Sequence, residues 1–248
     1  MRRHYPQHRV IRPMGHQGNH GRLAASALFL AGLGLLLFNL VASIPFGHAP
    51  LHVGRAILER ASGDTGADNI VTAILLGYRG LDTLGEVTIL FTAAAAAGMV
   101  LASAGRGQAQ GEDAGFIFRT AAWMLFPFLL VVGAYIIIHG HLTPGGGFQG
   151  GAILAAAFFT PLLASPASPF NHRVATLVEG FAGLAFIVIG LLGMLGGGQF
   201  LTQLFGKGAP GALFSAGSLP ILYLAIGLKV GSELAGLMAS VFGGKEKA

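Results

Sequence analysis

Apolar runs of membrane-spanning length recur along this chain and are separated by short polar or glycine-rich segments. A helix needs about 20 predominantly apolar residues to cross a bilayer. The runs that reach this length, alone or with a few flanking residues, lie at about 23–46, 87–102, 116–138, 148–163, 174–195 and 213–241. The pattern therefore predicts an all-α integral membrane protein with about six transmembrane helices, a short half-helix and a Gly-rich hairpin.

The half-helix is predicted from a shorter apolar stripe at residues 68–78, with Asp68 as a candidate N-cap. Eleven residues are too few to cross a bilayer. We therefore expect a half-helix or an interfacial helix here, preceded by a polar loop at 47–67. The stripe consists of Ile70, Val71, Ile74, Leu75 and Tyr78.

Residues 139–151 interrupt the apolar pattern with a run in which six of thirteen residues are glycine. Proline lacks a backbone N–H and glycine adopts almost any backbone angle, so this run cannot continue a helix. Two interpretations of the expected hairpin stay open: a compact turn between closely packed helices, and a backbone-lined element beside an ion path. The signature of the hairpin comprises Thr143, Pro144, Gly145, Gly146, Gly147, Phe148, Gln149, Gly150 and Gly151.

Two four-residue patterns predict where helices begin. Thr83 and Glu86 have the spacing of a capping box, and so do Thr176 and Glu179. A role as a structural cap is the first interpretation of Glu179, and a place in an ion pathway is the alternative.

The composition agrees with a membrane location and excludes several classes of protein. Hydrophobic residues make up 53% of the 248 residues, charged residues make up 10%, and the mean hydropathy is +0.69. The absence of cysteine excludes disulfides, thiolate metal sites and cysteine nucleophiles. The sequence contains no phosphate-binding loop, dinucleotide fingerprint or metalloprotease pattern. We therefore expect that the chain is not an enzyme and that it needs no cofactor or metal.

The net charge of +5 indicates topology and not nucleic-acid binding, because the basic residues bracket the apolar runs. Both termini are predicted to be cytoplasmic, in the inner (plasma) membrane of a prokaryote. The inner segments would hold Arg2, Arg3, Arg9, Arg12, Arg22, Arg106, Arg119, Arg173, Lys245 and Lys247, and the outer segments Arg55, Arg60, Arg79 and Lys207.

Two ionisable residues lie inside the last apolar run. A lone charge at the bilayer centre costs about 2.5–3.5 kcal/mol even on the gentler insertion scale. Glu233 follows Lys229 by four residues, so the two share a helical face and can neutralise one another. Gly227 and Gly231 have the spacing that allows a close helix contact beside the charge. We expect an ion-pathway role for this pair, with a fixed helix register as the alternative.

His139 and His141 lie two residues apart on the hairpin. An unperturbed histidine titrates near physiological pH, so either could relay protons. Their spacing does not place both on one helical face, and no third ligand is near in sequence. A metal site is therefore not expected, and hydrogen bonding to hairpin carbonyls is as good an interpretation as a relay.

The run from Gly140 to Gly151 resembles the signature of the MnhB-like subunit of Mrp-type multisubunit sodium/proton antiporters. The resemblance covers roughly residues 116–238. The segment from Asp68 through Glu86 resembles the C-terminal tail of the large A subunit of the same antiporters, which occurs as a small separate subunit in membrane-bound hydrogenases. The chain thus resembles two subunits fused into one.

The resemblance divides the chain into modules. A basic cytoplasmic segment at 1–22 and a polar tail at 243–248 flank the membrane part. The modules between them are expected at 23–103 for the A-tail-like part with its short helix at 68–78, at 104–115 for a linker, and at 116–242 for the MnhB-like four-helix part.

The resemblance implies a membrane subunit of an Mrp-type sodium/proton antiporter complex, which contributes to the ion path and to assembly. The expected partners are large complex-I-like antiporter subunits, small Mrp subunits, the lipid bilayer, Na⁺ and H⁺. Asp82 and Glu86 are expected to line a polar path, although Asp82 could simply pair with Arg79 at the surface. The alternatives are a subunit of a redox-driven complex such as a membrane-bound hydrogenase, and a purely structural scaffold.

Overall fold

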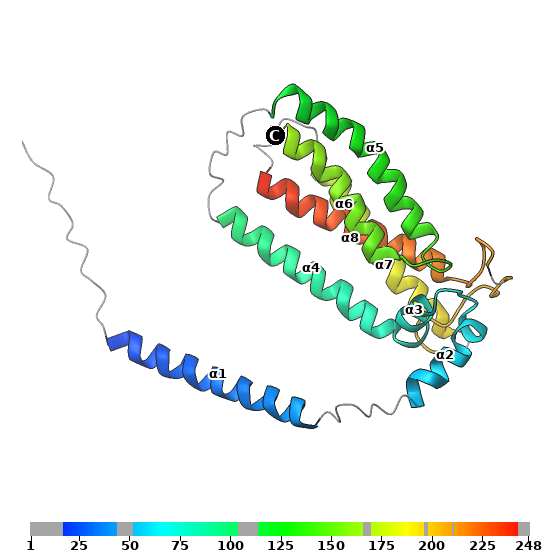
Figure 1. Cartoon of the computed structure of the whole chain (residues 1–248), viewed down its shortest axis with the longest axis horizontal. Helices are drawn as coiled ribbons and strands as arrows, with labels where there is room; N and C mark the ends of the chain where they lie inside the picture. The colour runs from blue at the N-terminus through cyan, green and yellow to red at the C-terminus, as the bar shows by residue number, and fades with distance from the viewer. Residues whose placement is uncertain are drawn as a thin grey trace, which may run out of the picture. The chain divides into compact units, whose positions relative to one another are not determined.

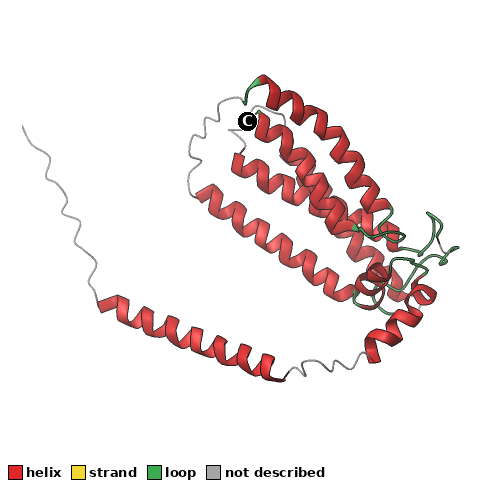
Figure 2. Ribbon diagram, in the orientation of Figure 1, coloured by secondary structure: helices red, strands yellow, loops and turns green. Residues whose placement is uncertain are grey.

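The computed structural model describes residues 17–43, 52–103, 114–165, 170–195, 198–209 and 211–242, and its regular elements in these ranges are all helical (Figures 1 and 2). Six of the described helices are long and apolar enough to cross a membrane, which confirms the predicted multi-pass, all-α membrane fold. These six are α1 (Gln17–Ser43), α4 (Gly80–Ser103), α5 (Phe116–Ile138), α6 (Gly147–Ala164), α7 (His172–Leu195) and α8 (Leu219–Phe242).

Three shorter elements lie between α1 and α4: α2 (His52–Thr65), α3 (Ile70–Thr72) and the π-helix η1 (Ala73–Tyr78). The predicted basic head at 1–22, linker at 104–115 and polar tail at 243–248 fall wholly or mostly outside the described residues. The chain divides into two compact units, Met1–His52 with α1 and Val53–Ala248 with the remaining helices. The second unit contains the hairpin and the charged residues of the last apolar run.

Helix α8 is the centre of this second unit and packs against α4, α5, α6 and α7. The close contacts of α8 are made at Gly227 and Gly231, the two small residues predicted to allow them. A Cβ added at Gly227 would lie 2.8 Å from Cγ1 of Ile137, and one added at Gly231 would lie 3.3 Å from the carbonyl oxygen of Gly151. The Gly-xxx-Gly spacing therefore lets α8 approach α5 and α6 closely, as expected. In Figure 1, α2, α3 and the loop before α8 gather at one end of these helices.

The segment predicted as a polar loop at 47–67 is largely helical, since α2 occupies most of it. Ala61 and Thr65 are buried, and Ile57 packs against the core. These three positions are four residues apart and form one narrow helical stripe. The prediction was wrong because small and polar residues make up most of that stripe.

The half-helix at 68–78 is present, but Asn69 caps it instead of Asp68. The Asn69 side chain accepts a hydrogen bond from the backbone N–H of Val71 at 3.0 Å. A π-turn follows, in which the backbone N–H of Arg79 donates to the carbonyl of Ile74 at 2.8 Å. This wider turn rotates the later residues relative to an α-helix. The fully buried residues are Thr72, Ala73 and Leu76, whereas the predicted stripe is half-buried at Ile70, Ile74 and Leu75 and exposed at Val71 and Tyr78.

Both predicted capping boxes are wrong. Helix α4 begins at Gly80, three residues before Thr83, whose hydroxyl instead donates to the carbonyl of Leu75 at 2.7 Å. Helix α7 begins at His172, after Asn171 accepts a hydrogen bond from the N–H of Val174 at 3.1 Å. The real starts lie one turn earlier, so both glutamates are free of the capping role.

The last span begins at Leu219, six residues later than the predicted start near residue 213. Residues 198–218 include a folded loop in which Leu201, Ser215, Ala216 and Ser218 are buried. Residues 212–216 belong to this loop and not to the helix.

Candidate functional site

The glycine-rich hairpin is a packed turn held by the preceding half-helix. Helix α5 ends at Ile138 and α6 begins at Gly147. The side-chain amide of Asn69 donates to the carbonyls of Gly140 and Thr143, both at 2.8 Å. These bonds satisfy main-chain acceptors that a non-helical segment beside a membrane would otherwise leave unpaired.

A second connection ties the hairpin to α8. The hydroxyl of Tyr223 donates to Thr72 Oγ1 at 2.7 Å, and the hydroxyl of Thr72 donates to the carbonyl of Gly140 at 2.6 Å. The described contacts therefore favour the compact-turn interpretation. We call this arrangement of Asn69, Thr72 and the hairpin carbonyls the hairpin clamp.

The structure places the two hairpin histidines in different surroundings. The ring of His139 stacks on Tyr135 with 4.2 Å between centroids. The side chain of His141 is completely buried. Burial lowers the pKa of His141, which favours its neutral ring. Within the described ranges, no three histidine or acidic side chains converge on a point where a metal ion could bind.

Near the middle of α8, the charged pair predicted from sequence is present and buried. Lys229 Nζ lies 2.9 Å from Glu233 Oε2, and the exposed fractions of the two residues are 7% and 4%. The second carboxylate comes from α7, since Glu179 Oε1 lies 3.8 Å from the same ammonium group. The ammonium also lies 5.1 Å from the ring centroid of Phe91 on α4. We call Lys229, Glu233 and Glu179 the charge cluster.

Two features of the charge cluster were not predicted. No pattern in the sequence indicates that Glu179 meets Lys229, because that contact depends on how α7 packs against α8. Phe91 was also missed, since it is one apolar residue among many in its run. A cation held over an aromatic ring gains electrostatic stabilisation in addition to its carboxylate partners.

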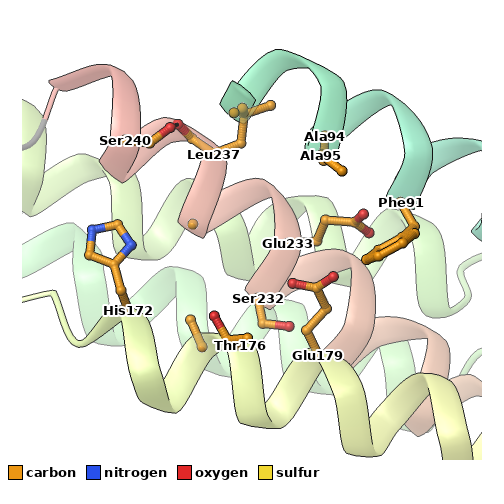
Figure 3. A pocket seen from close by; sticks show the side chains of 13 residues that line it. Phe91, Ala94, Ala95, His172, Thr176, Glu179, Ser232, Glu233, Leu237 and Ser240 are labelled. Atoms are coloured by element: carbon orange, nitrogen blue, oxygen red, sulfur yellow. Dashed lines mark hydrogen bonds between the residues drawn. The ribbon is translucent and has the colours of Figure 1, made fainter. Parts of the chain in front are cut away.

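A cavity of about 300 Å³ lies between α4, α7 and α8 and ends at the charge cluster. Figure 3 shows the Glu179 and Glu233 carboxylates facing the same space near Phe91, with His172 and Ser240 at the far end. His172 is the first residue of α7, and Ser240 lies in the last turn of α8. The cavity thus extends from one end of the helices to their buried charges. Its lining residues are Phe91, Ala94, Ala95, Gly98, His172, Ala175, Thr176, Glu179, Ser232, Glu233, Gly236, Leu237 and Ser240.

The remaining predicted acidic residues lie elsewhere. Asp82 pairs with Arg79 at 2.6 Å, and both side chains are more than half exposed. Glu86 is exposed on α4. Phe91 follows Glu86 by five positions, which corresponds to about 140° of rotation around the helix. Glu86 and Asp82 therefore occupy a different face of α4 from the cavity.

Comparisons with known proteins match the two halves of the chain to two families. A family model described as a domain related to the MnhB subunit of the Na⁺/H⁺ antiporter matches residues 117–236. A second model, that of the MbhE component of MBH, matches residues 24–104. An uncharacterised protein of Methanocaldococcus jannaschii is 32% identical over 202 residues, which are 70% of this chain and 76% of that protein.

Two solved structures are similar over nearly the whole chain. A chain of the membrane-bound sulfane sulfur reductase, an archaeal respiratory membrane complex, has 40% identity and a TM-score of 0.73, with 90% of this chain and 99% of that chain covered. A chain of the Mrp complex from Dietzia sp. DQ12-45-1b has 26% identity and a TM-score of 0.68, with 96% of this chain and 27% of that chain covered.

These matches confirm the resemblance that the hairpin signature and the segment from Asp68 to Glu86 indicated. The chain belongs to the family of membrane-complex subunits in which an MbhE domain precedes a domain related to the MnhB subunit of the Na⁺/H⁺ antiporter.

Proposed function

We propose that this chain is a membrane subunit of an Mrp-type cation/proton antiporter complex and contributes to its ion path and assembly. The observation that carries the proposal is the charge cluster, which lies inside the spanning helices at the end of a cavity. Charges are retained inside a membrane at considerable cost, and they mark ion and proton pathways. The similarity to the Mrp complex of Dietzia supports the assignment of the complex.

The exposed face of α4 is the second part of the proposed ion path. Asp82 and Glu86 are four residues apart and so share this face. Glu86 lies about 9 Å along α4 from its start, where an exposed carboxylate would meet lipid or another subunit. We propose that this face borders a neighbouring membrane subunit, with Na⁺ and H⁺ as the ions that move.

The positions of the basic residues support one orientation of the helices in the membrane. Arg55, Arg60, Arg79 and Lys207 belong to α2 and the loops at one end of the helices, whereas Arg119 and Arg173 lie at the starts of α5 and α7. We propose that the latter end faces the cytoplasm of a prokaryote, according to the positive-inside rule.

A redox-driven ion pump is the second candidate. The observation that favours it is the 40% identity to a chain of the sulfane sulfur reductase complex, of which 99% is covered. The same membrane module would then be driven by electron transfer instead of by a cation gradient. The charge cluster is compatible with an antiporter and with a redox-driven ion pump.

Purification of the intact complex through this chain tests the two candidates. For the antiporter we expect large antiporter-like subunits, no stoichiometric iron, and cation/proton exchange in liposomes without an electron donor. Stoichiometric iron, with ion movement only when an electron donor is supplied, would reject the antiporter in favour of the redox-driven complex. Subunit masses, metal analysis and a pH-sensitive dye provide the readouts.

Replacing Glu86 with alanine is expected to abolish exchange, because this carboxylate belongs to the proposed ion path. Assembly should be retained, because the side chain is exposed in the structure. The measurement compares exchange in everted membrane vesicles with the amount of assembled complex. Glu59→Ala, which removes an exposed carboxylate from α2 outside the spanning helices, is the matched control and should retain exchange. Intact exchange in Glu86→Ala would support the scaffold interpretation for this face.

A further inference from the structure

The charge cluster holds one more negative than positive group. Lys229 supplies one ammonium, whereas Glu179 and Glu233 supply two carboxylates. Among the described residues, the cavity wall adds no other ionisable side chain except His172 at its far end, since α4 contributes only Phe91, Ala94, Ala95 and Gly98. An uncompensated buried charge is costly in a low-dielectric interior. One additional positive charge would make the site neutral.

An unpartnered atom marks where that charge would bind. Glu233 Oε2 bonds to Lys229, but Glu233 Oε1 is buried without a hydrogen-bond partner among the described residues. Both Glu233 and Glu179 line the cavity, on α8 and α7 respectively (Figure 3). A proton on one carboxyl, or a cation between the two, would satisfy this oxygen.

The hydroxyl oxygen of Ser232 is a further potential ligand beside the two carboxylates. Ser232 lines the cavity beside Glu233, and its hydroxyl donates to the carbonyl of Leu228 at 2.6 Å. The lone pairs of that hydroxyl oxygen therefore remain free to accept. Hard monovalent and divalent cations favour oxygen ligands, and the single excess negative charge selects a monovalent ion.

The described lining residues of the cavity extend from the charge cluster to the end of the helices at which α7 begins. Glu179 follows His172 by seven positions on α7, and Ser240 follows Glu233 by seven positions on α8, each a rise of about 10 Å. Beyond the cluster, the Phe91 ring lies against the ammonium group, and Tyr223, Ile226 and Val230 of α8 are buried. The lining of the cavity therefore reaches the start of α7, which makes this end the candidate entrance.

We propose that Glu179 and Glu233 form an exchange site for one proton or one monovalent cation, reached through this cavity from the membrane end at which α7 begins. The inference rests on the proposed function and assigns to it a binding group, a stoichiometry and a side. Lys229 acts as the fixed counter-charge, which holds the two carboxylates together whether or not the site is occupied.

Thiol accessibility tests the route, and the chain contains no cysteine of its own. Thr176→Cys places a thiol in the cavity wall, and Ser240→Cys places one near its entrance. In membranes that contain the whole complex, a charged, membrane-impermeant methanethiosulfonate should label both from the side of Arg173 only. The mass of the isolated chain gives the readout. Absence of label at Thr176→Cys, or label from the opposite side, would overturn the proposed route.

A matched threonine outside the cavity provides the control. Thr160 lies near the end of α6, at the same end of the helices, and does not line the cavity. Thr160→Cys should stay unlabelled from both sides, because a thiol facing lipid is not ionised and meets no charged reagent. Thr202→Cys, in the loop before α8, should be labelled only from the other side.

Carbodiimide modification tests the binding group. Dicyclohexylcarbodiimide reacts with protonated carboxyl groups in apolar surroundings, so we expect one adduct per chain at Glu179 or Glu233. Peptide mass mapping distinguishes this adduct from one at the exposed Glu86. Protection by Na⁺ or K⁺ would assign a cation site, and an adduct that depends on pH but not on these ions would assign a proton site. No adduct at either carboxyl at any pH would reject the inference.

Glu179→Gln is the decisive variant. It leaves the Lys229–Glu233 pair in place, so we expect assembly to be retained, the adduct to be lost, and exchange to stop. Retained adduct formation at Glu233 with normal exchange would show that Glu179 is not part of the site.

The two proposals can fail separately. If the wild-type complex exchanges ions without an electron donor but forms no adduct, the exchange site is wrong and the proposed function stands. If the adduct forms with cation protection but ions move only with an electron donor, the site stands and the antiporter assignment is wrong.

Discussion

Replacing Lys229 with methionine is expected to destabilise the chain more than any other single charge removal in the membrane helices. Methionine keeps most of the side-chain volume, but Glu179 and Glu233 then face one another with no counter-charge. Removing one partner of a buried ion pair costs about 3–5 kcal/mol, because the remaining charge stays buried and uncompensated. The amount of complex that survives heating, measured by size-exclusion chromatography, should fall sharply.

A neutral triple variant separates the loss of charge balance from the loss of packing. Lys229→Met combined with Glu179→Gln and Glu233→Gln leaves no formal charge in the charge cluster. Its thermal stability should recover toward the wild-type value, while ion exchange should not recover. Equal stability of Lys229→Met and wild type would mean that water in the assembled complex compensates both carboxylates, contrary to the burial of Glu233 in the structure.

The second large effect is expected from Gly151→Val, where α6 meets α8. A Cβ at this position would lie 2.8 Å from the carbonyl oxygen of Gly227 and 2.8 Å from Cβ of Val230. Neither atom is the end of a flexible side chain, so the two helices must separate. Overpacking of this kind costs about 1–3 kcal/mol, and more when backbone has to move. Thermal stability of the complex and the yield of assembled chain should both decline.

Gly180→Val is the matched control for this change. Gly180 also lies inside a spanning helix, but a Cβ there would meet nothing within 4 Å. The same substitution should therefore leave thermal stability close to wild type. If Gly151→Val were as stable as Gly180→Val, the close contact of α6 with α8 would not be needed for the fold.

Periodicity in the sequence predicted the parts of this structure that depend on one helix at a time. The four-residue spacing of Lys229 and Glu233 was enough to place both on one face, and the ion pair is confirmed at 2.9 Å. The apolar runs likewise predicted the six spans, because their length is set by the bilayer and not by neighbouring helices.

Features that depend on packing between helices were not predictable. Glu179 reaches Lys229 only because α7 lies beside α8, and no local pattern encodes that neighbour. The capping-box spacing at Thr83 and Thr176 misled for a related reason. A Thr-x-x-Glu pattern is equally compatible with the first turn and with the second turn of a helix, and in both cases the helix starts earlier.

The loop before α8 shows how apolar character alone can mislead. Leu213 to Ala216 look like the start of a span, yet Ser215 and Ala216 are buried in a folded loop. The backbone N–H of Ala216 bonds to the carbonyl of Lys207 at 2.8 Å. Such a segment satisfies its polar groups through a distant partner, which a window of neighbouring residues does not reveal.

The hairpin clamp limits which amino-acid substitutions each of the two modules can accept. Asn69 and Thr72 bond to carbonyl oxygens of the hairpin, and these acceptors are present whatever side chains the hairpin carries. The hairpin side of the joint can therefore accept substitutions that preserve its backbone course. The half-helix side cannot, because the Asn69 side chain donates two N–H bonds to the hairpin and accepts one from Val71, and only a side-chain amide combines these groups. The contact between the two modules thus tolerates substitutions of the hairpin side chains but not of Asn69.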